Sequence, residues 1–179
     1  RTAITFDNKW TQFLTVTKGV LQGDPASPLF FNICFNTLMI TLKAPEYKNL
    51  GYIWGPKNSQ FESSWLQFAD DAVIISNNSQ NTQPLINLFL AWTKWADMKI
   101  RLDKCQTFGM AKRENCFTQI IPSIFIKRDA IPAIPIGDSF TYLGKIFNFT
   151  MKNEEAKEAL STKLKSLLNV TNNLEISAQ

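Results

Sequence analysis

The stretch that decides the fold is Trp65-Leu66-Gln67-Phe68-Ala69-Asp70-Asp71-Ala72-Val73-Ile74-Ile75-Ser76. Two apolar runs flank a short polar segment, a pattern that predicts a β-hairpin with Asp70 and Asp71 at its bend. Adjacent carboxylates repel each other unless a cation lies beside them, and Mg²⁺ prefers hard oxygen ligands of this kind. The pair is therefore a candidate metal site, although Asp is also a common residue of solvated turns.

A second candidate site lies upstream, in a loop over residues 18–28 that is rich in glycine and proline. Gly19 and Gly23 permit close approach of another backbone or of a ligand. Gln22 offers both a donor and acceptors, which suit the edges of sugars or bases. The alternative is an ordinary loop in which Ser27 caps the helix that follows.

Hydrophobic periodicity outside these two segments predicts a mixture of helices and short strands. Helices are expected over residues 29–42, 82–97 and 154–172, and the first of them is apolar on most sides, as a buried helix would be. Strands are expected at 2–6 and 10–17 around a turn at 7–9, from 98 onward, and near 105–111, 123–127 and 139–149, with a turn at 127–129. Residues 43–64 are expected to be mostly loop with one short strand. Without a repeating βαβ rhythm, the fold class is α+β with an antiparallel sheet packed on helices.

Composition limits the chemistry that the chain can perform. A hydrophobic fraction of 45% with 12% aromatic residues is ample for a packed core. Nineteen basic and 15 acidic residues give a net charge of +4, which is compatible with a polyanionic partner without demonstrating one. The chain contains no histidine, which excludes histidine triads and histidine metal sites within it. Carboxylates, lysines, hydroxyls and bound metal ions remain.

The cysteines and the start of the chain indicate the compartment in which the protein works and whether it is part of a longer protein. Cys34, Cys105 and Cys116 show no metal-like spacing and cannot all pair, so a reducing compartment is expected. No apolar run is long enough to span a membrane. The chain begins with Arg1 inside a predicted strand, so it is expected to be a piece of a longer protein.

The two motifs together resemble the palm of reverse transcriptases. The segments that carry the resemblance are Gly19-Val20-Leu21-Gln22-Gly23-Asp24-Pro25-Ala26-Ser27-Pro28-Leu29-Phe30-Phe31-Asn32 and Phe68-Ala69-Asp70-Asp71. Within that family, the sequences of the two motifs are most similar to those of retroelements that lack long terminal repeats (LINE-like elements). The resemblance implies an RNA-directed DNA polymerase that uses Mg²⁺ and deoxynucleoside triphosphates to extend a DNA primer on an RNA template. It also implies an intracellular location, in the nucleus or the cytoplasm.

The resemblance assigns roles to particular residues. It implies metal binding and catalysis by Asp70 and Asp71, with Lys104 protonating the leaving pyrophosphate, since a lysine ammonium can donate a proton at neutral pH. The nucleotide and template site would be lined by Gln22, Gly23, Pro25 and Ser27. A primer grip would be formed by Tyr142, Leu143 and Gly144. Residues 1–150 would belong to the palm, and residues 151–179 would begin the thumb.

One part of the family's pattern is missing. The family places its first catalytic aspartate on a separate strand well upstream of the loop at 19–28. Asp7 lies too close to Gln22 to be that residue, and its neighbours make it a turn residue. Because a two-metal site needs carboxylates from both strands, we expect that this chain alone cannot polymerise.

Two other interpretations stay open from the sequence. The chain is alternatively a catalytically inactive nucleic-acid-binding remnant of such an element, in which basic side chains hold phosphates without turnover. It is alternatively related to group II intron maturases, which share the palm and also bind their intron RNA. An upstream aspartate would argue against the first alternative, and an adjoining maturase-type or endonuclease domain would decide the second.

Overall fold

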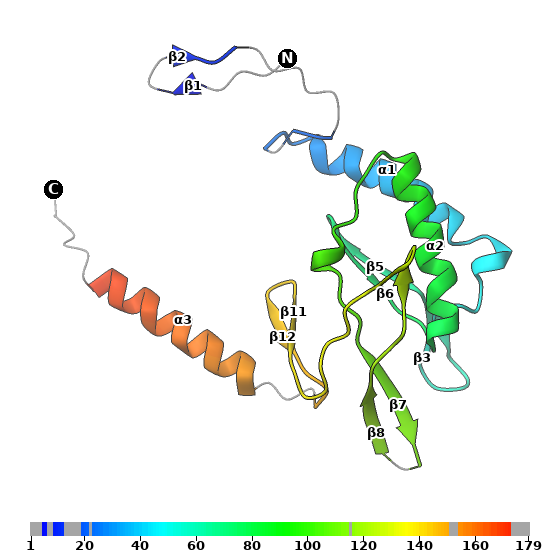
Figure 1. Ribbon diagram of the computed structural model, residues 1–179. Helices are drawn as coiled ribbons and strands as arrows, with labels where there is room; N and C mark the ends of the chain where they lie inside the picture. Colours follow the sequence, from blue (N-terminus) through cyan, green and yellow to red (C-terminus); the bar gives the residue numbers. More distant parts are fainter. Residues whose placement is uncertain are drawn as a thin grey trace. The chain divides into compact units, whose positions relative to one another are not determined.

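The computed structural model describes residues 5–6, 9–12, 19–21, 23–114, 116–150 and 154–172. The chain divides into two compact units, residues 1–100 and 101–179 (Figure 1). Each unit is treated separately below. Among the described residues, no helix is both long and apolar enough to cross a membrane.

The first unit combines two long helices with short hairpins. Its elements in chain order are β1 (Thr5–Phe6), β2 (Lys9–Trp10), α1 (Ser27–Thr41), a 3-10 turn (Pro45–Tyr47), β3 (Tyr52–Trp54), β4 (Phe61–Ser63), β5 (Trp65–Phe68), β6 (Asp71–Ile74) and α2 (Ser79–Trp95). The predicted hairpin around the aspartate pair is confirmed as β5–β6. Of the predicted first hairpin, residues 2–4, 7–8 and 13–17 lie outside the described residues.

The second unit is built mainly from hairpins and ends in a helix. Its elements are a 3-10 turn (Leu102–Lys104), β7 (Gly109–Arg113), β8 (Cys116–Ile120), β9 (Phe125–Ile126), β10 (Asp129–Ala130), β11 (Phe140–Tyr142), β12 (Lys145–Phe147) and α3 (Glu154–Asn172). The predicted helix over 154–172 is confirmed at both ends. Leu160, Leu164 and Leu167 along it are all more than half exposed.

The strands confirm the α+β class but do not join into one sheet. In the described part of the chain, every strand pairs with one antiparallel neighbour, so each sheet is a two-stranded hairpin. The expectation of a single antiparallel sheet is therefore wrong for these residues. Strands of two to five residues separated by close turns satisfy their ladder partners locally.

The core of the first unit lies between α1 and α2. Phe35, Leu38 and Trp92 are buried together, with the Phe35 and Trp92 ring centroids 4.5 Å apart. Trp65 of β5 packs against this cluster and meets Phe89 of α2 edge to face at 4.9 Å. One cluster therefore supports both helices and the hairpin that carries the aspartates. Figure 1 shows the course of these elements, α1, α2, β5 and β6.

The apolar composition of helix α1 predicted that it would be buried on most sides, and this prediction is wrong. Leu29, Phe30, Ile33 and Ile40 are each about three-fifths exposed. Apolar composition shows that a helix gains from burial, but it does not show which of its faces a neighbour covers. The covered face is the one that meets α2.

Helix α1 also begins differently from the prediction. Ser27 lies inside the helix rather than capping it, and its hydroxyl donates to the carbonyl of Leu21 at 2.5 Å. The Asp24 carboxylate accepts from the amide of Ala26 at 2.8 Å. The loop is thus closed by side-chain bonds from both residues, and Ser27 is buried.

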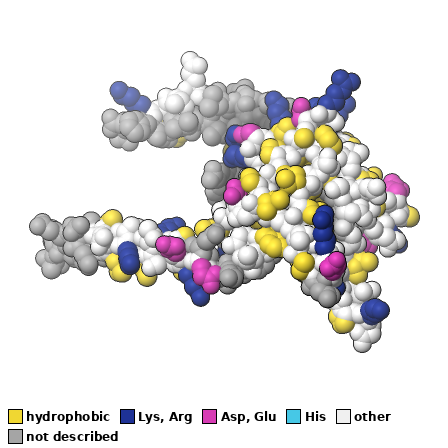
Figure 2. Space-filling model, turned by 60° about the horizontal axis from the view of Figure 1, so that its bottom comes forward, with side chains coloured by type: hydrophobic (Ala, Val, Ile, Leu, Met, Phe, Trp, Pro, Cys, Tyr) yellow, Lys and Arg dark blue, Asp and Glu magenta, His cyan; other side chains and the backbone are white. Residues whose placement is uncertain are grey.

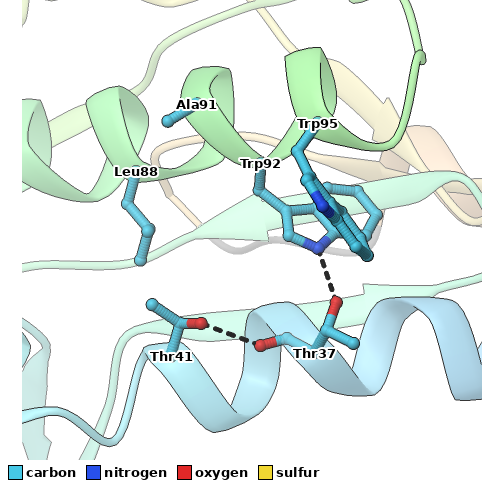
Figure 3. A pocket seen from close by; sticks show the side chains of 6 residues that line it. All are labelled: Thr37, Thr41, Leu88, Ala91, Trp92 and Trp95. Carbon is cyan, nitrogen blue, oxygen red and sulfur yellow. Dashed lines mark hydrogen bonds between the residues drawn. The ribbon is translucent and has the colours of Figure 1, made fainter.

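Helix α2 begins at Ser79, three residues before the predicted start at residue 82. The side chain of Asn78 caps it by accepting from the amide of Asn81 at 2.8 Å. Trp95, at the end of the helix, is 67% exposed. It borders an open hollow of about 260 Å³ between α1 and α2, where the Trp92 indole donates to the Thr37 hydroxyl at 2.8 Å (Figure 3).

The segment predicted as loop, 43–64, holds the hairpin β3–β4. Glu62 organises it, because its carboxylate accepts from the amides of Asn49 at 3.0 Å and Gly51 at 2.6 Å. A Cβ on Gly51 would lie 2.8 Å from the backbone of Ser63, so this close approach requires glycine. These contacts depend on tertiary neighbours, which the local pattern does not contain.

The segment after α2 was also misjudged from its alternation. Residues 98–101 form no strand, and Leu102–Lys104 form a 3-10 turn. Strand β8 was not predicted, yet it pairs with β7 over five residues, from Gly109↔Ile120 to Arg113↔Cys116. Short alternating patterns do not distinguish a strand from a turn with one buried side.

Candidate functional site

The turn of hairpin β5–β6 presents the aspartate pair to solvent. Phe68 pairs with Asp71, so Ala69 and Asp70 form the two-residue bend and Asp71 begins β6. Ala69 has φ 49°, in the left-handed region that side-chain-bearing residues rarely adopt. Both carboxylates are exposed. The local sequence therefore places two adjacent acidic groups at the tip of the hairpin, as predicted.

A short chain of hydrogen bonds connects this turn to the core. The indole of Trp65 donates to the Gln67 side-chain oxygen at 2.8 Å. The amide nitrogen of Gln67 in turn donates to the carbonyl of Ala69. Gln67 was not among the predicted site residues, although a polar residue between Leu66 and Phe68 was the available signal. The Gln67 side chain thus connects the bend at Ala69 to Trp65 of the core.

The aspartates themselves are available for a ligand. In the part of the chain that the structure describes, neither carboxylate has a hydrogen-bond or ion-pair partner. Hard, unengaged oxygen donors side by side fit a divalent cation such as Mg²⁺. The same described residues contain no group of three or more acidic or cysteine side chains placed to hold a metal. A complete site therefore requires a further ligand.

The glycine-rich loop lies before α1 in the same unit. Gly19 and Gly23 have φ of 84° and 90°, and a Cβ on either would meet no atom within 4 Å. Both glycines thus allow a positive φ that other residues rarely adopt, and both leave open space beside the backbone. Pro25 is exposed and Ser27 is buried. Gln22 lies outside the described residues.

Loop and aspartate hairpin are linked through the core. Helix α1, which begins at the end of the loop, and Trp65, which begins β5, pack against the same cluster of Phe35, Leu38 and Trp92. The two sequence motifs therefore belong to one folded unit. The hollow between α1 and α2 has no titratable residue among the six side chains that line it, so it offers no equivalent chemistry (Figure 3).

The remaining predicted residues lie in the second unit. Lys104 ends the 3-10 turn and is exposed. Its neighbour Asp103 is held by Arg101, whose Nε lies 3.2 Å from the carboxylate, and this bond lowers the pKa of Asp103. Among the described residues Lys104 makes no ion pair.

Tyr142, Leu143 and Gly144 come together in the turn of β11–β12. Tyr142 pairs with Lys145, and both turn residues have positive φ, 48° at Leu143 and 75° at Gly144. The side chain of Leu143 is 49% exposed. Phe140 of this hairpin packs against Phe108, with the two ring centroids 5.4 Å apart and the ring planes tilted by 42°.

The chain belongs to the reverse transcriptase (RNA-dependent DNA polymerase) family, whose model matches residues 1–147. The resemblance based on the loop and the aspartate hairpin is thereby confirmed.

Individual relatives are retrotransposon proteins. The chain is 28% identical over 151 residues to the retrovirus-related Pol polyprotein from type-2 retrotransposable element R2DM of Drosophila melanogaster, which covers 83% of the chain and 13% of the relative. It is 25% identical over 140 residues to the corresponding polyprotein from type-1 retrotransposable element R2 of Nasonia vitripennis, covering 76% of the chain and 13% of the relative. The R2 polyprotein of Popillia japonica is 23% identical over 141 residues, 78% of the chain and 19% of the relative. The chain thus spans less than a fifth of the length of these relatives.

Proposed function

We propose that this chain is part of the palm of a retrotransposon reverse transcriptase, which extends a primer 3′-hydroxyl with deoxynucleotides on an RNA template. The observation that carries the proposal is the exposed, unpartnered pair Asp70–Asp71 at a bend fixed to the core through Gln67. The family match over residues 1–147 supports it. Residues 1–150 would form palm and residues 151–179 the start of the thumb, in a protein that works inside the cell.

Asp70 and Asp71 would hold the divalent metal ions of the reaction, together with a carboxylate from outside the described residues. When bound, such ions activate the attacking hydroxyl and neutralise the leaving pyrophosphate. Asp70, at the bend itself, is the better placed direct ligand. The rigid connection from Trp65 through Gln67 keeps the two carboxylates in position, which avoids reorganisation when the substrate binds.

The other residues would handle the substrates. Gly23 and Pro25, with Gln22, would line the nucleotide and template, where the open space beside Gly23 admits a ligand close to the backbone. Ser27 would act by fixing the loop, since its hydroxyl is bonded to Leu21. Lys104 would donate a proton to the leaving pyrophosphate.

The primer grip would be the turn of β11–β12. Leu143 presents an exposed apolar side chain, and Gly144 leaves its backbone uncovered, because a Cβ there would meet nothing within 4 Å. Tyr142 would support this turn from the strand. An apolar contact with a sugar and an uncovered backbone amide are both suited to a primer terminus.

The test is primer extension on an RNA template by a longer polypeptide that joins this chain to an upstream catalytic aspartate. Asp70→Asn should lower the rate at least about a hundredfold, because metal-held charge is worth several kcal/mol in the transition state. Asp129→Asn, at an exposed carboxylate of hairpin β9–β10, is the matched control and should leave the rate unchanged. Equal rates for the Asp70→Asn variant and the unmodified protein would refute the proposal.

A further inference from the structure

The second unit contains a hollow of about 440 Å³ that none of the proposed polymerase roles uses. Two aromatic side chains line it, Phe117 of β8 and Phe149 just after β12. Polar groups on its wall come from Thr118, Asn148 and Thr150. Its volume falls within the range of small-molecule sites, roughly 300–1,000 Å³.

One wall of the hollow is fixed by a buried glutamine. Gln119 is nine-tenths buried, and its amide nitrogen donates to the carbonyls of Ile134 at 3.3 Å and Pro135 at 2.9 Å. Its side-chain oxygen accepts from the amide of Gly137 at 3.0 Å. These bonds hold the loop 134–137 against β8, so the hollow has a defined shape before any ligand arrives.

The polar wall of the hollow includes an internal hydrogen bond that engages one acceptor. The Thr150 hydroxyl donates to the side-chain oxygen of Asn148 at 2.9 Å. With that oxygen engaged, the Asn148 amide nitrogen retains its N–H groups for a ligand. A carbonyl oxygen on the edge of a flat ring is a matching acceptor.

The aromatic wall is open to a stacking partner. Phe117 is 63% exposed, although it is a large apolar side chain. Its cross-strand partner is Lys112, and Arg113 follows at the end of β7. In the described part of the chain neither cation has an ion-pair partner, and both are exposed. Figure 2 shows hydrophobic side chains in several surface patches, with Lys and Arg side chains scattered among them.

We propose that this hollow binds one unpaired nucleobase of a single-stranded nucleic acid. The base would stack on Phe117, its edge would accept a hydrogen bond from Asn148, and Lys112 would lie against the adjoining phosphate. Base–aromatic stacking together with a nearby cation is the general basis of single-strand binding. The inference rests on the proposed function only in taking a nucleic acid as the molecule present.

The test is anisotropy of a labelled single-stranded RNA 12-mer with the 179-residue chain in EDTA, where no divalent cation contributes. Phe117→Leu should weaken binding at least about fivefold, because one stacked base contributes about 1–3 kcal/mol. Phe117→Trp should retain the affinity, since it preserves a stacking ring. Ile121→Ala is the matched control, because Ile121 is equally exposed in the same unit but does not line the hollow.

Further arms identify the ligand. Asn148→Ala should weaken binding about two- to tenfold, and Lys112→Gln should reduce the dependence of affinity on salt. A DNA 12-mer of the same sequence shows whether the 2′-hydroxyl matters, and a blunt duplex should bind more weakly because its bases are already stacked. A 2-aminopurine in the RNA should change fluorescence with the unmodified chain and not with Phe117→Leu.

Failure of this inference is separable from failure of the proposed function. Equal RNA affinity of Phe117→Leu and the unmodified chain would overturn the proposal that the hollow binds a base. Absence of RNA binding would overturn it as well, and the hollow would then suit another occupant, such as an apolar peptide. Polymerase activity is measured with metal and depends on Asp70, so the two experiments share neither readout nor residue.

Discussion

Hairpins β5–β6 and β11–β12 both reverse direction through two residues, and each holds a residue with a side chain in the left-handed region. These are Ala69, with φ 49°, and Leu143, with φ 48°. In β11–β12 the second position is Gly144, also at positive φ, which is the pattern of the favoured type I′ turn. In β5–β6 the second position is Asp70, which does not have positive φ. The β11–β12 turn therefore has glycine at one of its two left-handed positions, whereas the β5–β6 turn places Ala69 in the left-handed region and a carboxylate, Asp70, beside it.

The two hairpins also differ in what supports them. Trp65 anchors β5–β6 to a cluster that contains the fully buried Leu38. Hairpin β11–β12 rests on half-buried rings, with Phe140 stacked on Phe147 at 5.6 Å. A strained bend persists only where its surroundings over-determine it. The stronger support therefore lies under the turn that carries the aspartates.

The largest expected effect comes from removing that support. Leu38→Ala should destabilise the first unit by about 2–5 kcal/mol, because it leaves a cavity at a site with no exposure. All five tryptophans lie within residues 1–100, so tryptophan fluorescence during urea unfolding reports on this unit alone. Phe140→Ala is the comparison and should leave the tryptophan midpoint unchanged. Equal shifts for both variants would show that the two hairpins share one support.

Sequence alone predicted the parts of this comparison that depend on local pattern. The three helices have long apolar periodicity, and the aspartate hairpin has apolar runs on both sides of a polar bend, so both signals are contained in the segment itself. Leu143 and Gly144, by contrast, lie within residues 139–149, which were predicted as strand, and only the family resemblance singled them out.

Contacts between distant segments were not predictable in this way. The hairpin β3–β4 depends on Glu62 bonding to the backbone at Asn49 and Gly51, and Ser27 is held by Leu21 rather than acting as a cap. For the candidate site, the sequence identified the acidic pair but not Gln67, whose role depends on Trp65 being fixed by the core. The missing metal ligand cannot be inferred from the described residues at all.

Exchanging the turn residues should change stability by smaller amounts and in opposite directions. Gly144→Ala should destabilise β11–β12 by about 1 kcal/mol, because a Cβ there meets no atom and the cost is backbone strain alone. Ala69→Gly should stabilise β5–β6 by up to about 1 kcal/mol, since relief of strain exceeds the added chain entropy. Amide hydrogen exchange within each hairpin measures both changes. Loss of stability in Ala69→Gly would mean that Ala69 is not strained.

The smallest expected effect is a difference in alkylation rate between two thiols of the second unit, Cys105 and Cys116. Burial raises the pKa of Cys105, with the nearby Asp103 charge adding to the shift, whereas Cys116 is exposed near the β7–β8 turn. The thiolate is the reactive form, so Cys105 should be alkylated several times more slowly than Cys116 at mildly alkaline pH. Because the folded chain keeps this proton to higher pH than the unfolded chain, Cys105 contributes stability that is lost as the pH rises through the alkaline range above the thiol's ordinary pKa. Mass spectrometry of the alkylated peptides measures both rates, with Cys105→Ser as the control for assignment. Equal rates at the two sites would show that the segment after the 3-10 turn opens readily, and Lys104 would then lack the fixed position that its proposed role requires.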